Sequence, residues 1–184
     1  MARAKVSDFL HSFRFHVQIT GFGAGGDHQL GAGGVKPDAG FNSCSTPEAS
    51  HDAVEYREGH YVYTRKFVGL PSVSTVSLSR GVALTDGSFW KWMKDVIEGN
   101  AEYRANLDIF HLHRDSKPAT TSNSVNTEMG INVGPSDKGF IVYKCREVFP
   151  IRHKVAGDLD STSSEVSIQE IELAVEHFDV ELHE

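Results

Sequence analysis

Cysteine is scarce in this chain. Its 184 residues include only Cys44 and Cys145, which lie far apart in the sequence. Two such cysteines cannot build the disulfide framework on which small secreted domains depend. We therefore expect two free, buried thiols in a protein that is made in the reducing cytoplasm.

Long apolar runs are also missing. None approaches the roughly 20 residues that a helix needs to cross a bilayer, so we expect no membrane insertion by this chain. The N-terminal segment carries positive charge, but Asp8, His11 and Arg14 interrupt its apolar stretch. A signal peptide needs an unbroken apolar region, and we therefore expect no export signal.

An excess of basic residues is absent as well. The formal net charge is −7 with histidine neutral, so the chain has no overall basic field to gather nucleic acid or an anionic membrane. Basic side chains such as Arg57, Arg65 and Arg80 are interspersed with acidic ones, which argues against a nucleic-acid-specific site. An acidic balance suits solubility and docking against a basic protein partner.

Catalytic constellations are missing too, since no Ser/His/Asp or Cys/His arrangement occurs at local spacing. Residues 21–26 read GFGAGG and satisfy the glycine pattern of a dinucleotide site. That site requires a helix to begin there, but more glycines and Pro37 follow, which favours a loop. We expect no catalytic residue, no cofactor and no enzyme activity.

The sequence gives little support for a metal site. His111 and His113 lie two apart on a predicted strand and face the same side, but a site needs a third and usually a fourth ligand. Residues 158–164 resemble the start of a calcium loop, yet Ser163 and Gln169 replace the glycine and glutamate that it requires. We expect no metal site and interpret residues 158–164 as a polar connector.

Alternating apolar residues are present in abundance and predict strands. The clearest runs are 13–19, ending at Gly21, and then 73–78, 106–112 and 140–148. Residues 50–67 alternate unevenly and are rich in charge and tyrosine, which predicts a long exposed hairpin around residues 58–60. In residues 166–175 the alternation changes phase near Gln169 and Glu170, as a β-bulge would cause. Val180 and Leu182 extend this strand or form a short tail.

One helix is expected near residues 89–97. Its apolar residues recur at the spacing of one helical face: Phe89, Trp92, Met93, Val96 and Ile97. Asp86 or Ser88 can cap its start and Gly99 its end. Many strands, one helix and no alternation of strands with helices predict a mainly β fold, an antiparallel β-sandwich or barrel with one packed α-helix.

Several segments, taken in order, resemble the tail-tube family of contractile injection systems, the inner-tube proteins of contractile phage tails and phage-tail-like particles. They are FRFHV (13–17), VEYREG (54–59), RKFVGL (65–70), VSLSRG (76–81), FWKWM (89–93), DVIEG (95–99), FPIRHKV (149–155), DLD (158–160) and EVSIQEIELAVEH (165–177). Together they cover most of a single domain, residues 1–184. Residues 22–40 and 117–139 are unmatched and are expected to be insertions or long loops.

The resemblance implies a structural subunit, similar to the haemolysin-coregulated protein, that assembles into stacked hexameric rings. Its implied partners are copies of itself, a sheath protein and baseplate or spike proteins; whether the lumen carries cargo is left open. The chain would be made in the cytoplasm and become part of an assembled tail or injection particle. The predicted hairpin has the aromatic content of a protein–protein contact. By the family pattern it is assigned to contacts with neighbouring subunits, through Tyr56, Arg57, Tyr61, Tyr63 and Arg65.

Two alternatives stay open. The same fold could serve as a tube initiator at the baseplate of such an apparatus. The second alternative belongs to another functional class: a monomeric β-sandwich that binds a metal or small ligand through His111, His113 and the glycine- and histidine-containing loop. The sequence does not distinguish a phage from an injection-system origin.

Overall fold

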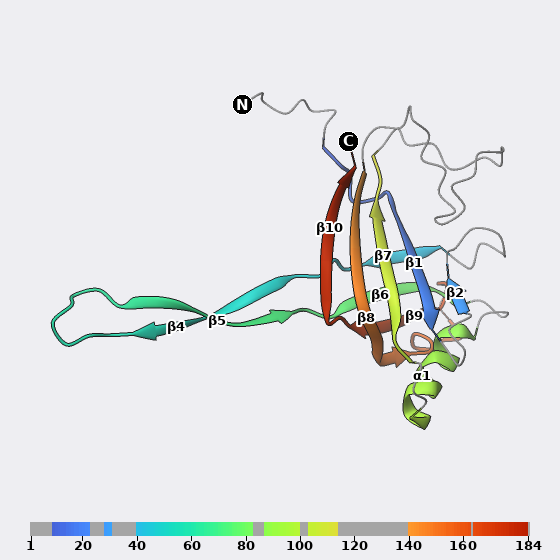
Figure 1. Cartoon of the computed structure of the whole chain (residues 1–184). Coiled ribbons are helices and arrows are strands. Elements are labelled where there is room, and N and C mark those ends of the chain that lie inside the picture. Colours follow the sequence, from blue (N-terminus) through green and yellow to red (C-terminus); the bar gives the residue numbers. More distant parts are fainter. Residues whose placement is uncertain are drawn as a thin grey trace.

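A computed structural model describes residues 9–22, 28–30, 40–82, 87–99, 103–113, 140–162 and 164–183. These residues form a mainly β fold with one helix, as expected. Figure 1 shows a body of long strands, a helix at one end of it, and a hairpin that projects far from the body. The strands of the body form one open sheet, and the hairpin forms a separate two-stranded sheet.

The open sheet has two halves that share one long strand, β8. The first half contains β1 (Phe15–Phe22), β2 (His28–Leu30), β7 (Ala105–His111), β8 (Phe140–Lys154) and β10 (His177–His183). The second contains the end of β8 together with β9 (Ile168–Ala174), β6 (Val76–Gly81) and β3 (Phe41–Cys44). All of these strands pair in the antiparallel sense. The sheet ends at β2 and β3, so the described strands form a sandwich and not a closed barrel.

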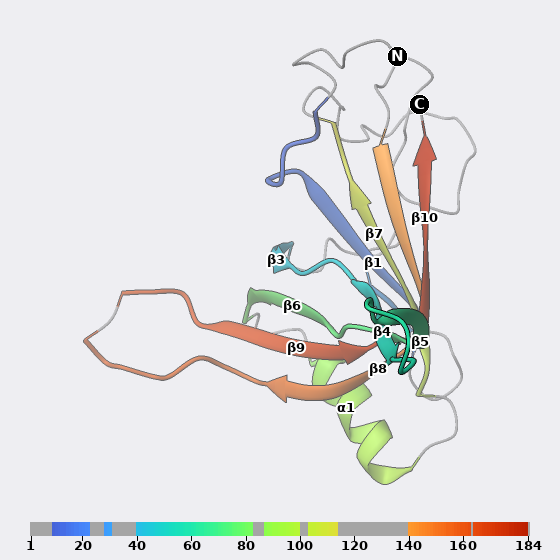
Figure 2. The same cartoon turned by 90° about the vertical axis from the view of Figure 1, so that its left-hand side faces the viewer.

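Strand β8 turns from one half to the other at Glu147. It pairs with β10 up to Arg146, with β7 up to Val148, and with β9 from Phe149 onward. Glu147 has a φ of 54°, and an extra β8 residue lies between the pairs Leu107↔Cys145 and Ala105↔Val148. Such a bulge bends a strand and lets it change sheets. Figure 2 shows the change of direction.

Arg104 ties this corner to a neighbouring turn. Its guanidinium lies 3.1 Å from the Glu147 carboxylate and also contacts that of Glu176, between β9 and β10. These hydrogen bonds raise the pKa of Arg104, so it stays charged. The contribution to stability is small because all three side chains are accessible to water.

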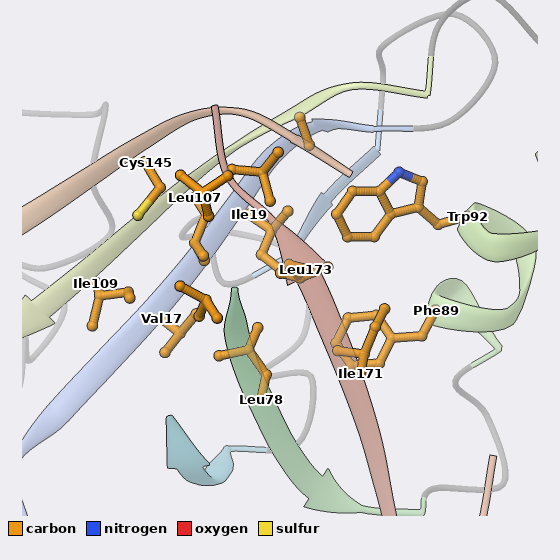
Figure 3. Packing of buried hydrophobic residues seen from close by; sticks show 14 residues of the cluster. Val17, Ile19, Leu78, Phe89, Trp92, Leu107, Ile109, Cys145, Ile171 and Leu173 are labelled. Atoms are coloured by element: carbon orange, nitrogen blue, oxygen red, sulfur yellow. The ribbon is translucent and has the colours of Figure 1, made fainter. Parts of the chain in front are cut away.

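The core lies between the two halves (Figure 3). Val17, Ile19 and Leu107 from the first half face Leu78, Ile171 and Leu173 from the second; all are buried. Period-2 alternation places them there, because successive strand residues point to opposite faces. Phe89 and Trp92 of the helix close one side of this cluster.

Helix α1 spans Ser88–Glu98 and packs on β8. Gly99 ends it in a left-handed conformation, as predicted. The predicted start was wrong: Ser88 is the first helical residue, and the cap is Gly87, which has no side chain to bond the helix. The Ser88 hydroxyl instead accepts a hydrogen bond from the buried Arg80 guanidinium, which stacks over the Phe89 ring. Asp86 lies outside the described residues.

Glycine marks a bulge, not the end, of the first strand. Strand β1 continues through Gly21 to Phe22, and its pairing with β2 shifts at Gly21, which has a φ of 77°. Strand β2 lies inside the segment 22–40 that was expected to be a loop. The rest of that segment, apart from Phe22 and Gly40, and all of segment 117–139, lies outside the described residues.

Three other strand predictions need correction. The run 73–78 is divided at residues 74–75, so Val73 ends one strand and Val76 begins the next. The predicted bulge in β9 does not occur, because β9 pairs with β6 without a register shift. The irregularity lies in β8, where Ile151 is the extra residue opposite β9. Val180 and Leu182 extend no earlier strand, because the chain turns after β9 and they belong to β10.

Candidate subunit interface

The projecting hairpin consists of β4 (Ala49–Tyr56) and β5 (Arg65–Val73). Every residue of β4 is exposed, and in β5 only Gly69 and Val73 are partly covered. A two-stranded hairpin with no packed face is at best marginally stable in water. The hairpin therefore has the properties of an element that is completed by another molecule.

Side chains on one face of the outer hairpin form an apolar and aromatic surface. Val54 pairs with Phe67, and Tyr56 pairs with Arg65, so these four side chains share a face. Each apolar member exposes more than half of its surface: Val54 53%, Tyr56 54% and Phe67 54%. The opposite face carries the ion pair of Lys66 Nζ with Glu55 Oε1 at 3.3 Å.

Two loop tyrosines extend this surface. The Arg65 guanidinium lies 5.3 Å from the centroid of the Tyr61 ring, and Tyr61 meets Tyr63 edge to face at 6.3 Å. We call the combined surface the aromatic face; it consists of Val54, Tyr56, Tyr61, Tyr63, Arg65 and Phe67. Tyrosine and arginine are the residue types enriched in protein–protein contacts.

The predicted contact residues are mostly brought together. Tyr56, Tyr61, Tyr63 and Arg65 belong to the aromatic face, whereas Arg57 is exposed at the start of the loop and forms no ion pair with a described residue. Tyr61 and Tyr63 lie in the loop between residues 56 and 65 and not on a strand, because β5 begins only at Arg65. That these residues contact a neighbouring subunit stays a prediction.

Sequence reasoning missed Val54 and Phe67 as members of this surface. Val54, Phe67 and the tyrosines do not follow one alternating pattern, so spacing alone does not place them on one face. The register of β4 against β5 places them there.

The hairpin is electrically neutral in an acidic chain. Residues 49–73 contain three acidic and three basic residues, against a net charge of −7 for the whole chain. Several are paired within the hairpin, as Arg65 is with Glu58 at 3.8 Å. An apolar, neutral surface suits contact with another protein more than capture of a charged ligand.

The other candidate sites, the histidine pair and the glycine-rich segment, show no group of ligating or catalytic side chains among the described residues. His111 Nε2 donates a hydrogen bond to the His11 carbonyl, 3.1 Å away, and His113 is buried. Among the described residues, no three histidine, cysteine or acidic side chains gather as metal ligands would. Strand β2 begins at His28, where the helix of a dinucleotide site would have to run.

The connector at residues 158–164 joins β8 to β9, as predicted. The Asp160 carboxylate accepts hydrogen bonds from the Thr162 amide at 2.9 Å and from its hydroxyl at 2.8 Å. These bonds lower the pKa of Asp160. They are the contacts of a polar turn.

Both cysteines are free thiols, as predicted. Cys145 is buried in the core and Cys44 is partly buried against it. Burial raises the pKa of each thiol to about 12, so neither is an activated nucleophile. No helix among the described residues is long and apolar enough to span a membrane.

The described residues thus define a class of protein: an open β-sandwich with one packed helix and a projecting hairpin whose aromatic side chains are exposed. A family model described as "T4-like virus tail tube protein gp19" matches residues 11–179. The chain therefore belongs to this family of tail tube proteins, as the resemblance in its sequence indicated. The chain is a tail tube protein.

Solved structures share the fold. A chain of the extracellular contractile injection system "PVC sheath-tube complex in extended state" superposes with a TM-score of 0.66 at 19% identity, over 96% of this chain and 93% of that one. A chain of the anti-feeding prophage baseplate gives a TM-score of 0.65 at 19% identity, over 98% and 97%. A chain from the "PVC sheath/tube terminator" gives 0.65 at 21% identity, over 96% and 99%. No curated protein matches this chain.

Proposed function

We propose that this chain is the main structural subunit of the inner tube, assembling into hexameric rings that stack into a hollow tube, without enzymatic activity. The observation that carries the proposal is the uncovered hairpin. Its aromatic face has no cover from the described part of its own chain, and a subunit of a repeating assembly can cover it with the next copy. A contact between two different surfaces of identical subunits builds a ring when the rotation between neighbouring subunits adds up to a full turn. When that rotation does not close, the same kind of contact builds a filament.

The proposed partners are copies of the chain, a sheath protein around the tube, and baseplate or spike proteins at its end. Support comes from family membership and from the titles of the similar structures, which name sheath–tube, baseplate and tube-terminator assemblies. The chain would be made in the cytoplasm and then become part of an assembled particle.

Light scattering and negative-stain electron microscopy of the purified protein test this proposal. We expect a concentration-dependent transition from single subunits to rings and tubes. A protein that stays monomeric up to high concentration and binds a stoichiometric metal would support the monomeric β-sandwich with a ligand site near His111 and His113.

The tube initiator at the baseplate is a second candidate. The likeness to a chain of the anti-feeding prophage baseplate, which covers nearly all of both chains, supports it. The copy number per particle separates the two roles, because an initiator occurs in one or a few rings and the main subunit in every ring. Quantitative mass spectrometry of purified particles, with the sheath protein as internal reference, measures this number.

A further inference from the structure

The hairpin contains a bulge between its base and its tip. Its pairing passes from His51↔Pro71 to Ala53↔Val68, so that two residues of β5, Gly69 and Leu70, stand opposite Asp52 alone. A bulge of this kind bends the strand and increases its twist. In Figure 1 the two strands of the hairpin cross between its base and its tip.

The position requires glycine. A Cβ atom on Gly69 would lie 2.8 Å from the backbone oxygen of Asp52 and 2.9 Å from its Cβ. Both contacts are shorter than real Cβ atoms make, and one of them is to backbone that cannot move aside. The close approach of the two strands at this point therefore depends on the missing side chain.

The bulge also sets which residues form the aromatic face. With the extra residue, Phe67 lies opposite Val54 and Arg65 opposite Tyr56. If the complete sequence paired regularly from the base, with every residue of β5 in the ladder, Val68 would lie opposite Val54 and Lys66 opposite Tyr56. The bulge thus lets β5 keep Phe67 and Arg65 on the face of Val54 and Tyr56 while the base of the hairpin holds its own register.

We propose that the bulge at Gly69 is a positioning element for assembly: it bends the hairpin so that the aromatic face meets a second copy of this chain. This inference rests on the proposed function, since the second copy is the subunit of the same tube. Gly69 touches no partner itself in this scheme. Gly69 affects assembly by setting the direction of the outer hairpin relative to its base.

Deletion of Gly69 tests the direction of the outer hairpin separately from the set of residues that form the aromatic face. A chain lacking this residue can keep the pairs Val54–Phe67 and Tyr56–Arg65 with Leu70 alone opposite Asp52, so the aromatic face keeps its members but the bend is lost. We expect the critical concentration for tube formation to rise about tenfold or more, which corresponds to about 1.4 kcal/mol per subunit. Gly69→Ala, which creates the clash with Asp52, should raise it as well.

The control is Gly59→Ala in the hairpin loop, where an added Cβ meets nothing within 4 Å. It should form tubes at the critical concentration of the unaltered protein. Strand pairing in the deletion variant is measured by combining Glu55→Cys with Lys66→Cys and testing for a disulfide between them. These two positions lie directly opposite each other, on the face away from the tyrosines. Opposed strand residues lie within the distance range of a disulfide, so this bond should form with and without Gly69.

Two results overturn the inference. One is tube formation by the deletion variant at the unaltered critical concentration, which would show that the bend has no role. The other is failure of the 55–66 disulfide in the deletion variant, which would show that the aromatic face is not preserved. Both leave the proposed function standing. Absence of tubes from the unaltered protein would instead remove the proposed function, and this inference with it.

Discussion

The Trp92 indole Nε1 donates a hydrogen bond to the Tyr103 carbonyl at 2.6 Å, and this bond fastens helix α1 to the segment that leads into β7. The ring itself is fully buried in the core cluster. A short helix of 11 residues has little stability alone, so this anchor and the Phe89 contact hold it on the sheet.

Trp92→Ala should destabilise the fold by roughly 3–5 kcal/mol, because it removes a large buried side chain and leaves a cavity. Trp92→Phe should cost about 1–3 kcal/mol, since the Tyr103 carbonyl loses its donor. Urea unfolding under non-assembling conditions measures both. Trp90→Ala is the matched control: this ring is 50% exposed on the same helix, so a change within about 0.5 kcal/mol is expected. Equal losses at Trp90 and Trp92 would contradict the placement of the helix.

Tyr61→Ser combined with Tyr63→Ser should leave the subunit folded but poor in assembly. Neither ring contributes to the core, and both belong to the aromatic face. Thermal unfolding should be nearly unchanged, while sedimentation should show a loss of rings and tubes. Glu55→Gln with Lys66→Gln, which removes the ion pair on the opposite face, should assemble normally. Unimpaired assembly of the double tyrosine variant would refute the assignment of this surface.

Stability should fall on mild acidification through His153. Burial lowers the pKa of this imidazole from 6.5, the hydrogen bond that its Nε2 donates to Gln169 Oε1 only partly opposes this, and the positive charge of Arg80 lowers the pKa further. The unfolded chain therefore binds the proton more readily, so this contribution to stability is complete above the unfolded pKa and is lost as pH falls from there to the folded pKa. The melting temperature should decrease between about pH 7 and pH 5. His153→Gln should weaken this dependence; an unchanged profile would exclude His153 as its source.

Both thiols should resist alkylation in the folded subunit. A pKa raised from 9.0 to about 12 leaves Cys44 and Cys145 with about a thousandfold less thiolate at neutral pH. Mass spectrometry after iodoacetamide treatment should find modification only once urea unfolds the protein. Rapid labelling of native Cys44 would contradict its burial against the core.

The sequence predicted the body of the fold well because its signals are local. Trp92 and Phe89 stand at helical spacing, and Ile171 and Leu173 alternate along a strand that the structure contains. Bulges were harder to locate, because they depend on the partner strand. The phase change near Gln169 suggested one in β9, but Val166 lies before the strand, Ile168 occupies an exposed position of it, and Gln169 takes the buried position. In the described part of the chain the register shifts lie at Gly21, Asn42, Gly69, Glu147 and Ile151.

The sequence predicted that the hairpin is a contact element, but not which of its residues share a face. Its tyrosine content indicated a protein–protein contact, and the resemblance to tail-tube proteins implied that the partner is a neighbouring subunit. The membership of Val54 and Phe67 follows from the register of β4 against β5, which is offset by one residue at Gly69 and which no pattern within one strand reveals. That offset arises from the pairing of two strands and from a close approach that only glycine allows.

Cryo-electron microscopy of tubes grown from the purified protein tests the central claim most directly. We predict stacked rings of six subunits in which the aromatic face of each hairpin is covered by a neighbouring copy of the chain. A homogeneous monomer at high concentration, or rings in which Tyr61, Tyr63 and Phe67 stay exposed to solvent, would contradict this account.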